Sequence, residues 1–295
     1  SYFFQMTSAT NLMEKVLFRF AKKWIAGDNI DDALRSAQEA YKNGRHAIIN
    51  KLGEYHTESK PILETISEYN KIIRSFREWK VRGAISIKPS QIGLSISHEA
   101  CLKNFEKIID AASKSHVFVW IDMESSDHTD ETLELYHDLF SRYERLGVAI
   151  QANLKRSLDD VKGLIHHGAK IRLVKGAYSE DKKISYKTRG EVDANYEKIM
   201  IFLFEEGNEF GIATHDSKLI ELAMNLSKAN QVKFEFQLLK GVREELKPKL
   251  VKDGFVVSDY IPYGTNWLPY SIRRLKERKS NILLLGSSFI QSHKV

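Results

Sequence analysis

Short β-rich runs recur along this chain, and amphipathic stretches with helical periodicity separate them. Parallel strands need a helical crossover between them, so this alternation is typical of a parallel sheet. Eight such runs, whose starts lie roughly 30 residues apart, predict an α/β chain folded as a (βα)8 barrel of the TIM type. The predicted strands are His46–Asn50, Ala84–Lys88, Val117–Asp122, Val148–Gln151, Ile171–Val174, Gly211–Thr214, Val232–Phe236 and Phe255–Tyr260.

Residues 11–43 also show helical spacing of apolar side chains, interrupted by a turn at Gly27-Asp28-Asn29. We therefore expect additional N-terminal helices, with residues 1–44 as a helical arm packed on the barrel and residues 45–295 as the catalytic barrel of a single domain. A doubly wound open sheet is the competing architecture, but it normally carries a glycine-rich phosphate turn after its first strand, and none occurs there. The predicted barrel helices are Ile62–Trp79, Glu99–Ser113, Glu131–Leu146, Ser157–His166, Asp193–Gly207, Lys218–Ala229, Val242–Lys252 and Pro269–Lys279.

The composition favours small anionic ligands. The chain carries 45 Lys and Arg against 39 Asp and Glu, a net charge of +6, and the two signs are interspersed rather than gathered into a nucleic-acid-binding patch. No apolar run approaches the roughly 20 residues that span a bilayer, and no signal-peptide pattern occurs at the start. We expect a cytoplasmic protein with at most peripheral contact at the inner face of the cell membrane. The single cysteine, Cys101, excludes an intrachain disulfide and a Cys-based zinc site.

Polar side chains stand at the ends of most predicted strands. In a (βα)8 barrel the carboxyl ends of all strands meet at one face, which carries the active site. The pattern therefore predicts a small-molecule site at that face. No second histidine accompanies His215 in this pattern, so we expect no metal site. The polar strand ends are Lys88, Asp122-Met123-Glu124, Gln151, Lys175–Tyr178, Thr214-His215-Asp216, Gln237 and Tyr260.

The predicted fifth strand carries an arginine, Arg172, among apolar neighbours. A buried guanidinium is unfavourable unless it meets an anion or several hydrogen-bond acceptors. A structural pair with a carboxylate and a role in holding a charged ligand are both open at this point.

The last predicted helix carries Arg273, Arg274 and Glu277. Glu277 lies four residues after Arg273, so the two share a helix face and can pair, which leaves Arg274 free to clamp a carboxylate through two parallel hydrogen bonds. Alternatively, both arginines reach the ligand and Glu277 orients them, or the segment is a solvated basic helix end. Lys88 is equally open, because it can bind a carboxylate, form a Schiff base or be an ordinary surface lysine.

Taken in order, these residues resemble the proline dehydrogenase family of flavoenzymes over roughly residues 45–280. The string from Arg172 to Tyr178 and the terminal double arginine are the most specific parts of the resemblance. The matching segments are Lys88-Pro89-Ser90, Asp122-Met123-Glu124, Gln151-Ala152, Arg172–Tyr178, Ala213-Thr214-His215, Glu235-Phe236-Gln237, Tyr260–Gly264 and Arg273-Arg274-Leu275 with Glu277.

The resemblance implies a barrel that holds FAD non-covalently at its mouth. It implies oxidation of L-proline to Δ1-pyrroline-5-carboxylate, the first step of proline degradation, with hydride transfer to the flavin N5. Electrons would pass to a quinone or similar acceptor, and a separate pyrroline-5-carboxylate dehydrogenase would take the product.

The resemblance also assigns roles to residues of this chain. Asp122 and Arg172 are the expected catalytic residues, with Asp122 orienting Lys88. The expected substrate-binding residues are Lys88, Arg273 and Arg274 on the carboxylate, Glu277 holding the arginines, and Tyr178, Leu239 and Tyr260 around the ring. The expected cofactor-binding residues are Met123, Gln151, Arg172, Val174, Lys175, Gly176, Thr214 and His215.

The chain departs from the family pattern at three positions. Asp216 stands where relatives often have Asn, Ser179 where many have Trp, and Lys240 where an aromatic residue or His is more usual. Tyr260 agrees with relatives that prefer proline, so we expect hydroxyproline to be oxidised poorly compared with proline.

Two other functions compete with this reading. One is a Schiff-base aldolase or lyase that uses Lys88 or Lys175 at a barrel mouth. The other is a basic adaptor for nucleic acid or an acidic membrane that uses Arg273–Lys279.

Overall fold

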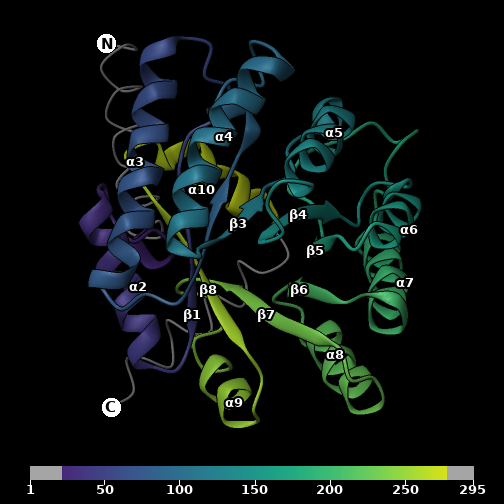
Figure 1. Cartoon of the computed structure of the whole chain (residues 1–295). Helices are drawn as coiled ribbons and strands as arrows, with labels where there is room; N and C mark the ends of the chain where they lie inside the picture. Colours follow the sequence, from purple (N-terminus) through teal and green to yellow (C-terminus); the bar gives the residue numbers. More distant parts are fainter. Residues whose placement is uncertain (1–21, 278–295) are drawn as a thin grey trace, which may run out of the picture.

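Eight parallel strands close into a barrel in the computed structural model, which describes residues 22–277. The strands follow one another around the barrel in sequence order, and β8 pairs with β1 (Figure 1). The prediction of a (βα)8 barrel is therefore confirmed. The strands are β1 (His46–Lys51), β2 (Gly83–Ile87), β3 (Phe118–Ile121), β4 (Leu146–Gln151), β5 (Lys170–Val174), β6 (Glu209–Ala213), β7 (Lys233–Leu239) and β8 (Val257–Tyr263).

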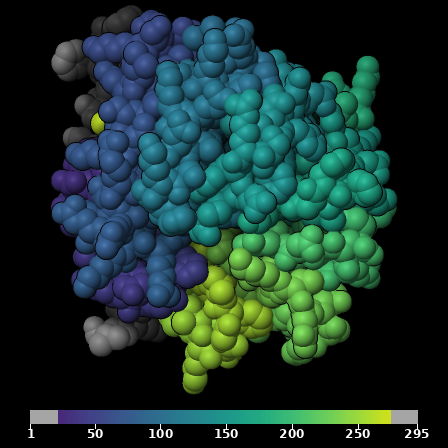
Figure 2. Space-filling model, viewed as in Figure 1, coloured from purple at the N-terminus to yellow at the C-terminus, as the bar shows by residue number. Residues whose placement is uncertain are grey.

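Helices alternate with the strands and form the outer layer of the barrel (Figure 1). In space-filling form, the side chains of successive helices meet over most of this face (Figure 2). No helix within residues 22–277 is both long and apolar enough to cross a bilayer. The helices that follow β1 to β7 are α3 (Ser59–Glu78), α4 (His98–Ser115), α5 (Thr129–Phe140), α6 (Ser157–His166), α7 (Arg189–Glu206), α8 (Ser217–Ala229) and α9 (Lys247–Lys252), with short 3-10 turns at Pro89–Gln91 and Ser126–His128.

The outer side of β8 and β1 is covered by α2 (Ile30–Lys42), which precedes the barrel in the chain. Asn29 and Asp32 form a reciprocal capping box at its first turn, which satisfies backbone donors at the helix start. Its buried face is built from Ala33, Leu34, Ala37 and Ala40. The domain boundary predicted at residue 44 stays a prediction, and residues 1–21 lie outside the described part of the chain.

The helix after β8 is α10 (Trp267–Glu277). Its Tyr270 joins a small apolar cluster with Leu52 after β1 and Leu239 at the end of β7. Because both partners lie at the carboxyl ends of their strands, α10 lies over the mouth of the barrel. This placement brings the two arginines of α10 to the face where the strand ends meet.

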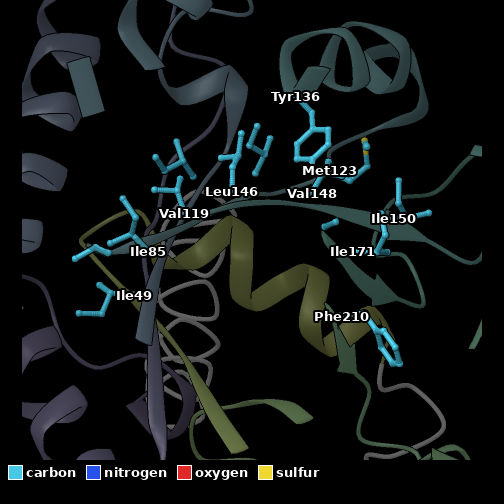
Figure 3. Packing of buried hydrophobic residues seen from close by; sticks show 14 of the residues in the cluster. Ile49, Ile85, Val119, Met123, Tyr136, Leu146, Val148, Ile150, Ile171 and Phe210 are labelled. Atoms are coloured by element: carbon cyan, nitrogen blue, oxygen red, sulfur yellow. The ribbon is translucent and has the colours of Figure 1, made fainter. Parts of the chain in front are cut away.

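The main apolar core lies between the barrel and its helices. Figure 3 shows Leu146 and Val148 of β4 beside Tyr136 of α5, and all three are fully buried. A smaller apolar cluster fills the inside of the barrel around Ile48 and Trp120. Burial on both faces explains why the strands read as near-continuous apolar runs in the sequence.

Two glycines inside the barrel make room for large side chains. A Cβ at Gly147 of β4 would lie 2.3 Å from the Trp120 ring, and one at Gly211 of β6 would lie 2.5 Å from Nε2 of Gln237. These separations are far below contact distance, so any added side chain would force the Trp120 ring or the Gln237 amide to move.

The last two strands differ from their predicted bounds. Pairing with β8 carries β7 on to Leu239, and pairing with β1 carries β8 on to Tyr263. Gln237 therefore lies within its strand, not after it as predicted, and Tyr260 lies in the middle of β8 instead of at its end. Two predicted helices are also shorter than expected, since α5 ends at Phe140 and the helix predicted from Val242 begins only at Lys247.

The Gly147→Ala variant is expected to lower the free energy of unfolding by about 1–3 kcal/mol, because its methyl group would overpack the Trp120 ring. Gly163→Ala in α6 is the matched control. Its added Cβ would meet nothing within 4 Å, so it should raise stability by about 0.4–1 kcal/mol. Urea unfolding of both variants checks this, and equal stabilities would contradict the packing described for Trp120.

Candidate active site

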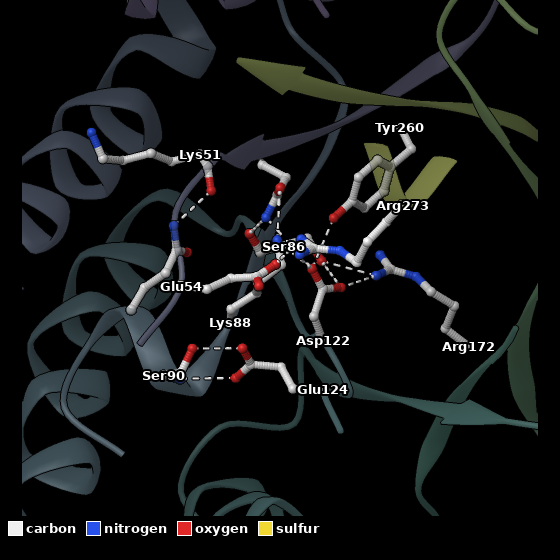
Figure 4. Close-up of polar contacts among 12 residues, drawn as sticks. Lys51, Glu54, Ser86, Lys88, Ser90, Asp122, Glu124, Arg172, Tyr260 and Arg273 are labelled. Carbon is white, nitrogen blue, oxygen red and sulfur yellow. Dashed lines mark hydrogen bonds and ion pairs between the residues drawn. The ribbon is translucent and has the colours of Figure 1, made fainter. Parts of the chain in front are cut away.

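Asp122 is the centre of a buried polar cluster at the mouth of the barrel (Figure 4). Its Oδ1 accepts hydrogen bonds from Arg172 Nη1 and from Ser86 Oγ, each at 2.6 Å. Its Oδ2 accepts one from the Tyr260 hydroxyl at 2.8 Å. The cluster thus joins residues from four strands: Ser86 lies in β2, Arg172 in β5 and Tyr260 in β8, and Asp122 directly follows β3.

Arg172 lies in the middle of β5 and is only 3% exposed. Its Nε donates to Gln237 Oε1 at 2.5 Å, and its guanidinium carbon lies 4.7 Å from the Trp120 ring and 5.4 Å from the Tyr260 ring. Its buried Nη2 has no hydrogen-bond partner among the described residues. Both roles left open for Arg172 therefore have support, because it pairs with a carboxylate and keeps a donor for an acceptor-rich ligand.

Lys88 follows β2 and is 7% exposed, so it is not an ordinary surface lysine. Its Nζ donates to Asn50 Oδ1 at 3.3 Å and lies 4.0 Å from Asp122 Oδ2. Asp122 is shared with Arg172, so two buried cations contact one carboxylate, while the buried Glu124 interacts with Lys88 over a longer distance. Two cations on one carboxylate keep donors that can bind a further anion.

The arginines of α10 face the same mouth. Arg273 forms an ion pair with Glu54, which follows β1, and its guanidinium lies 5.6 Å from the Tyr178 ring. The Tyr178 hydroxyl lies 3.5 Å from Glu54 Oε1, and Arg274 stacks 5.2 Å above Tyr270. Arg273 is thus tied into the site and does not belong to a solvated helix end.

The partner of Arg273 is a residue that sequence reasoning missed. Glu54 follows the first predicted strand, the one strand for which no polar residue at its end was predicted to join the site. The pairing of Arg273 with Glu277 stays a prediction, because the Glu277 side chain lies outside the described part of the structure.

A second buried carboxylate, Glu124, supports the loop that carries Glu54. It is fully buried and accepts hydrogen bonds from Ser90 N at 2.9 Å and Ser90 Oγ at 2.5 Å. Ser90 in turn accepts hydrogen bonds from the backbone N–H groups of Tyr55 and His56, each at 2.9 Å. Burial raises the pKa of Glu124, although its bonds with Ser90 oppose the shift.

Burial also raises the pKa of Tyr178 and of Tyr260 above the ordinary range for tyrosine. Nearby carboxylates, Glu54 for Tyr178 and Asp122 for Tyr260, act in the same direction. Both phenols therefore stay neutral and donate hydrogen bonds at working pH. Leu239, the third residue expected around the substrate ring, is 5% exposed and packs with Tyr260 and Tyr270.

The expected cofactor residues lie at the ends of the adjacent strands β3 to β6. Gln151 is 2% exposed and donates to the Glu124 carbonyl at 3.0 Å, and His215 Nε2 accepts from Leu239 N at 2.9 Å. Gly176 has a φ of +108°, and a Cβ there would lie 2.3 Å from Asn153 Oδ1, so the backbone at this point needs glycine. The other expected cofactor-binding residues at these strand ends are Met123, Val174, Lys175 and Thr214.

Lys175 belongs to a cluster of four charges beside these strand ends. It pairs with Asp193 and, at 3.1 Å, with Asp216, which also accepts from Arg189 at 2.8 Å. The ammonium group of Lys175 is thus held by two carboxylates. Burial alone would raise the pKa of Asp216, but hydrogen bonds from Arg189 and Lys175 lower it to about 2.

The fold and this site define a (βα)8-barrel enzyme with a group of cationic side chains at its mouth. The family model described as proline dehydrogenase matches residues 33–284. The chain therefore belongs to the proline dehydrogenase family and is an oxidoreductase that acts on proline.

Individual relatives agree with this assignment. The chain is 33% identical to proline dehydrogenase 1 of Bacillus subtilis (strain 168) over 264 residues, which is 88% of this chain and 87% of that protein. It is 30% identical to a proline dehydrogenase of Deinococcus radiodurans over 278 residues, which is 92% of this chain and 90% of that protein.

A solved structure matches as well. Proline utilization A from Bdellovibrio bacteriovorus, inactivated by N-propargylglycine, superposes with a TM-score of 0.83 at 25% identity. The match covers 92% of this chain and 34% of that longer chain.

Asp216→Asn is expected to lower the free energy of unfolding at neutral pH by about 1–2 kcal/mol through loss of charged hydrogen bonds. Asn keeps the capping acceptor for Lys218 N, so the variant isolates the charge. The pKa of Asp216 falls from 3.8 to about 2 on folding, so its contribution is present above pH 3.8 and is lost as pH falls through about 2.

Urea unfolding at a series of pH values measures this difference, with the exposed Asp110→Asn of α4 as the control. A stability difference for Asp216→Asn that does not shrink toward low pH would contradict the role given to its charge.

Proposed function

We propose that this protein binds FAD non-covalently and oxidises L-proline to Δ1-pyrroline-5-carboxylate. The observation that carries the proposal is the pair of buried cations, Lys88 and Arg172, that contact the same carboxylate, Asp122. The substrate is an amino acid whose acid end is an anion, and the cofactor offers many hydrogen-bond acceptors. Both therefore suit two buried cations of which one, Arg172, keeps a hydrogen-bond donor without a partner among the described residues.

The residues present suit a flavin. Arg172 Nη2 is a buried donor without a partner among the described residues, which suits a ligand rich in hydrogen-bond acceptors. Arg172 would meet the cofactor together with Gln151, while Lys175 and His215 would hold it from the ends of β5 and β6. When bound, FAD supplies the hydride acceptor, its N5 atom.

Cations at the mouth would hold the substrate. Lys88 would bind the proline carboxylate from the barrel, and Arg273 and Arg274 would bind it from α10. Groups on both sides of one carboxylate hold the ring in a single orientation, which removes much of the entropic part of the barrier. Glu277, at the end of the same helix, would hold the arginines in place.

Asp122 would keep this pocket in shape. It faces Lys88 and holds the Tyr260 hydroxyl, so the Tyr260 ring has one position beside the substrate. Tyr178 and Leu239 would complete the wall around the proline ring. The neutral phenols and the leucine bring no further charge, which leaves the carboxylate as the only strongly recognised group.

The cycle would close when electrons pass from the reduced flavin to a quinone or similar acceptor. A membrane quinone would require the protein to touch the membrane surface during this step. We further propose that a separate dehydrogenase oxidises the pyrroline product.

An anaerobic titration tests the proposed function directly. The purified protein, reconstituted with FAD, should show a flavin absorption band, and L-proline added without oxygen should bleach it. Protein that does not retain FAD, or a bound flavin that proline leaves oxidised, would contradict the proposal.

Arg274→Met is expected to raise the KM for L-proline by about tenfold to a hundredfold, the effect of losing hydrogen bonds between charged groups. The flavin should stay bound, because the clamp acts on the substrate. Steady-state kinetics and the visible spectrum measure both effects, with exposed Arg77→Met on α3 as the control. An unchanged KM, or loss of FAD alone, would show that Arg274 does not bind the substrate carboxylate.

A further inference from the structure

A chain of hydrogen bonds continues from the active site down the inside of the barrel. Arg172 Nε donates to Gln237 Oε1 at 2.5 Å, and Gln237 Nε2 donates to Glu235 Oε1 at 2.6 Å. Ser258 Oγ completes the chain by donating to Glu235 Oε2 at 2.7 Å. Gln237 and Ser258 are 3% and 1% exposed, so the chain belongs to the barrel interior.

The register of the strands explains how Gln237 reaches Arg172. Arg172 of β5 lies beside Gly211 of β6, which has no side chain between the two. A Cβ at Gly211 would lie 2.5 Å from Gln237 Nε2, so the glycine leaves the space that the glutamine fills. The contact between β5 and β7 across β6 is thus built into the barrel.

The amide of Gln237 can be oriented in only one way. A guanidinium only donates hydrogen bonds, and a carboxylate only accepts them. The oxygen of Gln237 must therefore face Arg172, and its nitrogen must face Glu235. Ser258 donates to the other carboxylate oxygen and so holds Glu235 in place.

This arrangement controls the charge around Arg172. Asp122 already contacts the guanidinium at 2.6 Å. Gln237 gives Arg172 a second acceptor, yet it keeps the second carboxylate, Glu235, one amide group away. Attraction between charges weakens with distance, so Glu235 neutralises Arg172 less than a carboxylate in direct contact would.

We propose that Gln237 is a positioning residue for the reaction. It fixes the Arg172 guanidinium in the cofactor site and keeps a second carboxylate, Glu235, from direct contact with it. Glu235 and Ser258 act through Gln237 by setting its orientation. The inference rests on the proposed binding of FAD. A positive charge near a flavin favours the electron-rich reduced form, so the midpoint potential of the flavin reports on Arg172.

The double variant Glu235→Gln/Gln237→Glu exchanges the carboxylate and the amide. The new carboxylate at position 237 accepts from Arg172, while the new amide at position 235 donates to it and accepts from Ser258. Net charge and the number of hydrogen bonds are conserved, but a second full negative charge, besides that of Asp122, now contacts Arg172. The midpoint potential is expected to become more negative, with flavin reduction by L-proline slowed about tenfold or more.

Gln237→Met tests the positioning role without adding charge. It leaves Arg172 Nε without its acceptor, so the rate constant of anaerobic flavin reduction should fall about tenfold to a hundredfold and the potential should become more negative. Asn104→Leu in α4 is the control, since it removes a hydrogen bond to the Ile92 carbonyl far from Arg172. It should lower the melting temperature without moving the potential.

Spectroelectrochemical titration of the FAD-loaded proteins and anaerobic stopped-flow kinetics measure these effects. A native potential and native reduction rate in Gln237→Met, or a native potential in the folded double variant, would overturn the inference while the proposed function stands. Failure of the parent protein to retain FAD, or of L-proline to reduce it, would overturn the proposed function, and the inference with it.

Discussion

The ion pair between Asp122 and Arg172 is the interaction on which the rest of the site depends. Both groups are buried at the mouth of the barrel, and their closest atoms lie 2.6 Å apart. A buried pair of this kind adds little net stability, because the desolvation of both charges offsets their attraction. Its effect is to organise its neighbours: Ser86, Tyr260 and Lys88 all take positions set by Asp122.

The site combines residues of the barrel strands with residues carried by α10, the helix that lies over the barrel mouth. Asp122, Arg172 and Lys88 lie in or directly after barrel strands, where the hydrogen-bonded sheet limits their movement. Arg273 lies on α10 and is held at the mouth by Glu54. Glu124 and Ser90 support the loop that carries Glu54, so the two parts are joined by buried hydrogen bonds.

The sequence predicted the barrel because the alternation of strands and helices is a local signal that survives without tertiary information. It also singled out Arg172, since an arginine in an apolar strand must find a partner. It missed the ion pair between Glu54 and Arg273, whose members are 219 positions apart and meet only because α10 folds over the mouth. It placed Gln237 after its strand because the register with β8, which extends β7, is a property of the closed sheet.

A crystal structure of the FAD-loaded protein with a five-membered-ring carboxylate that cannot be oxidised would test the central claim most directly. That claim is that the cations at the barrel mouth grip the acid group of proline beside the flavin. The account predicts the carboxylate between Lys88 and the arginines of α10, with Arg172 in contact with the cofactor. A carboxylate bound elsewhere, or arginines of α10 directed into bulk water in the complex, would contradict it.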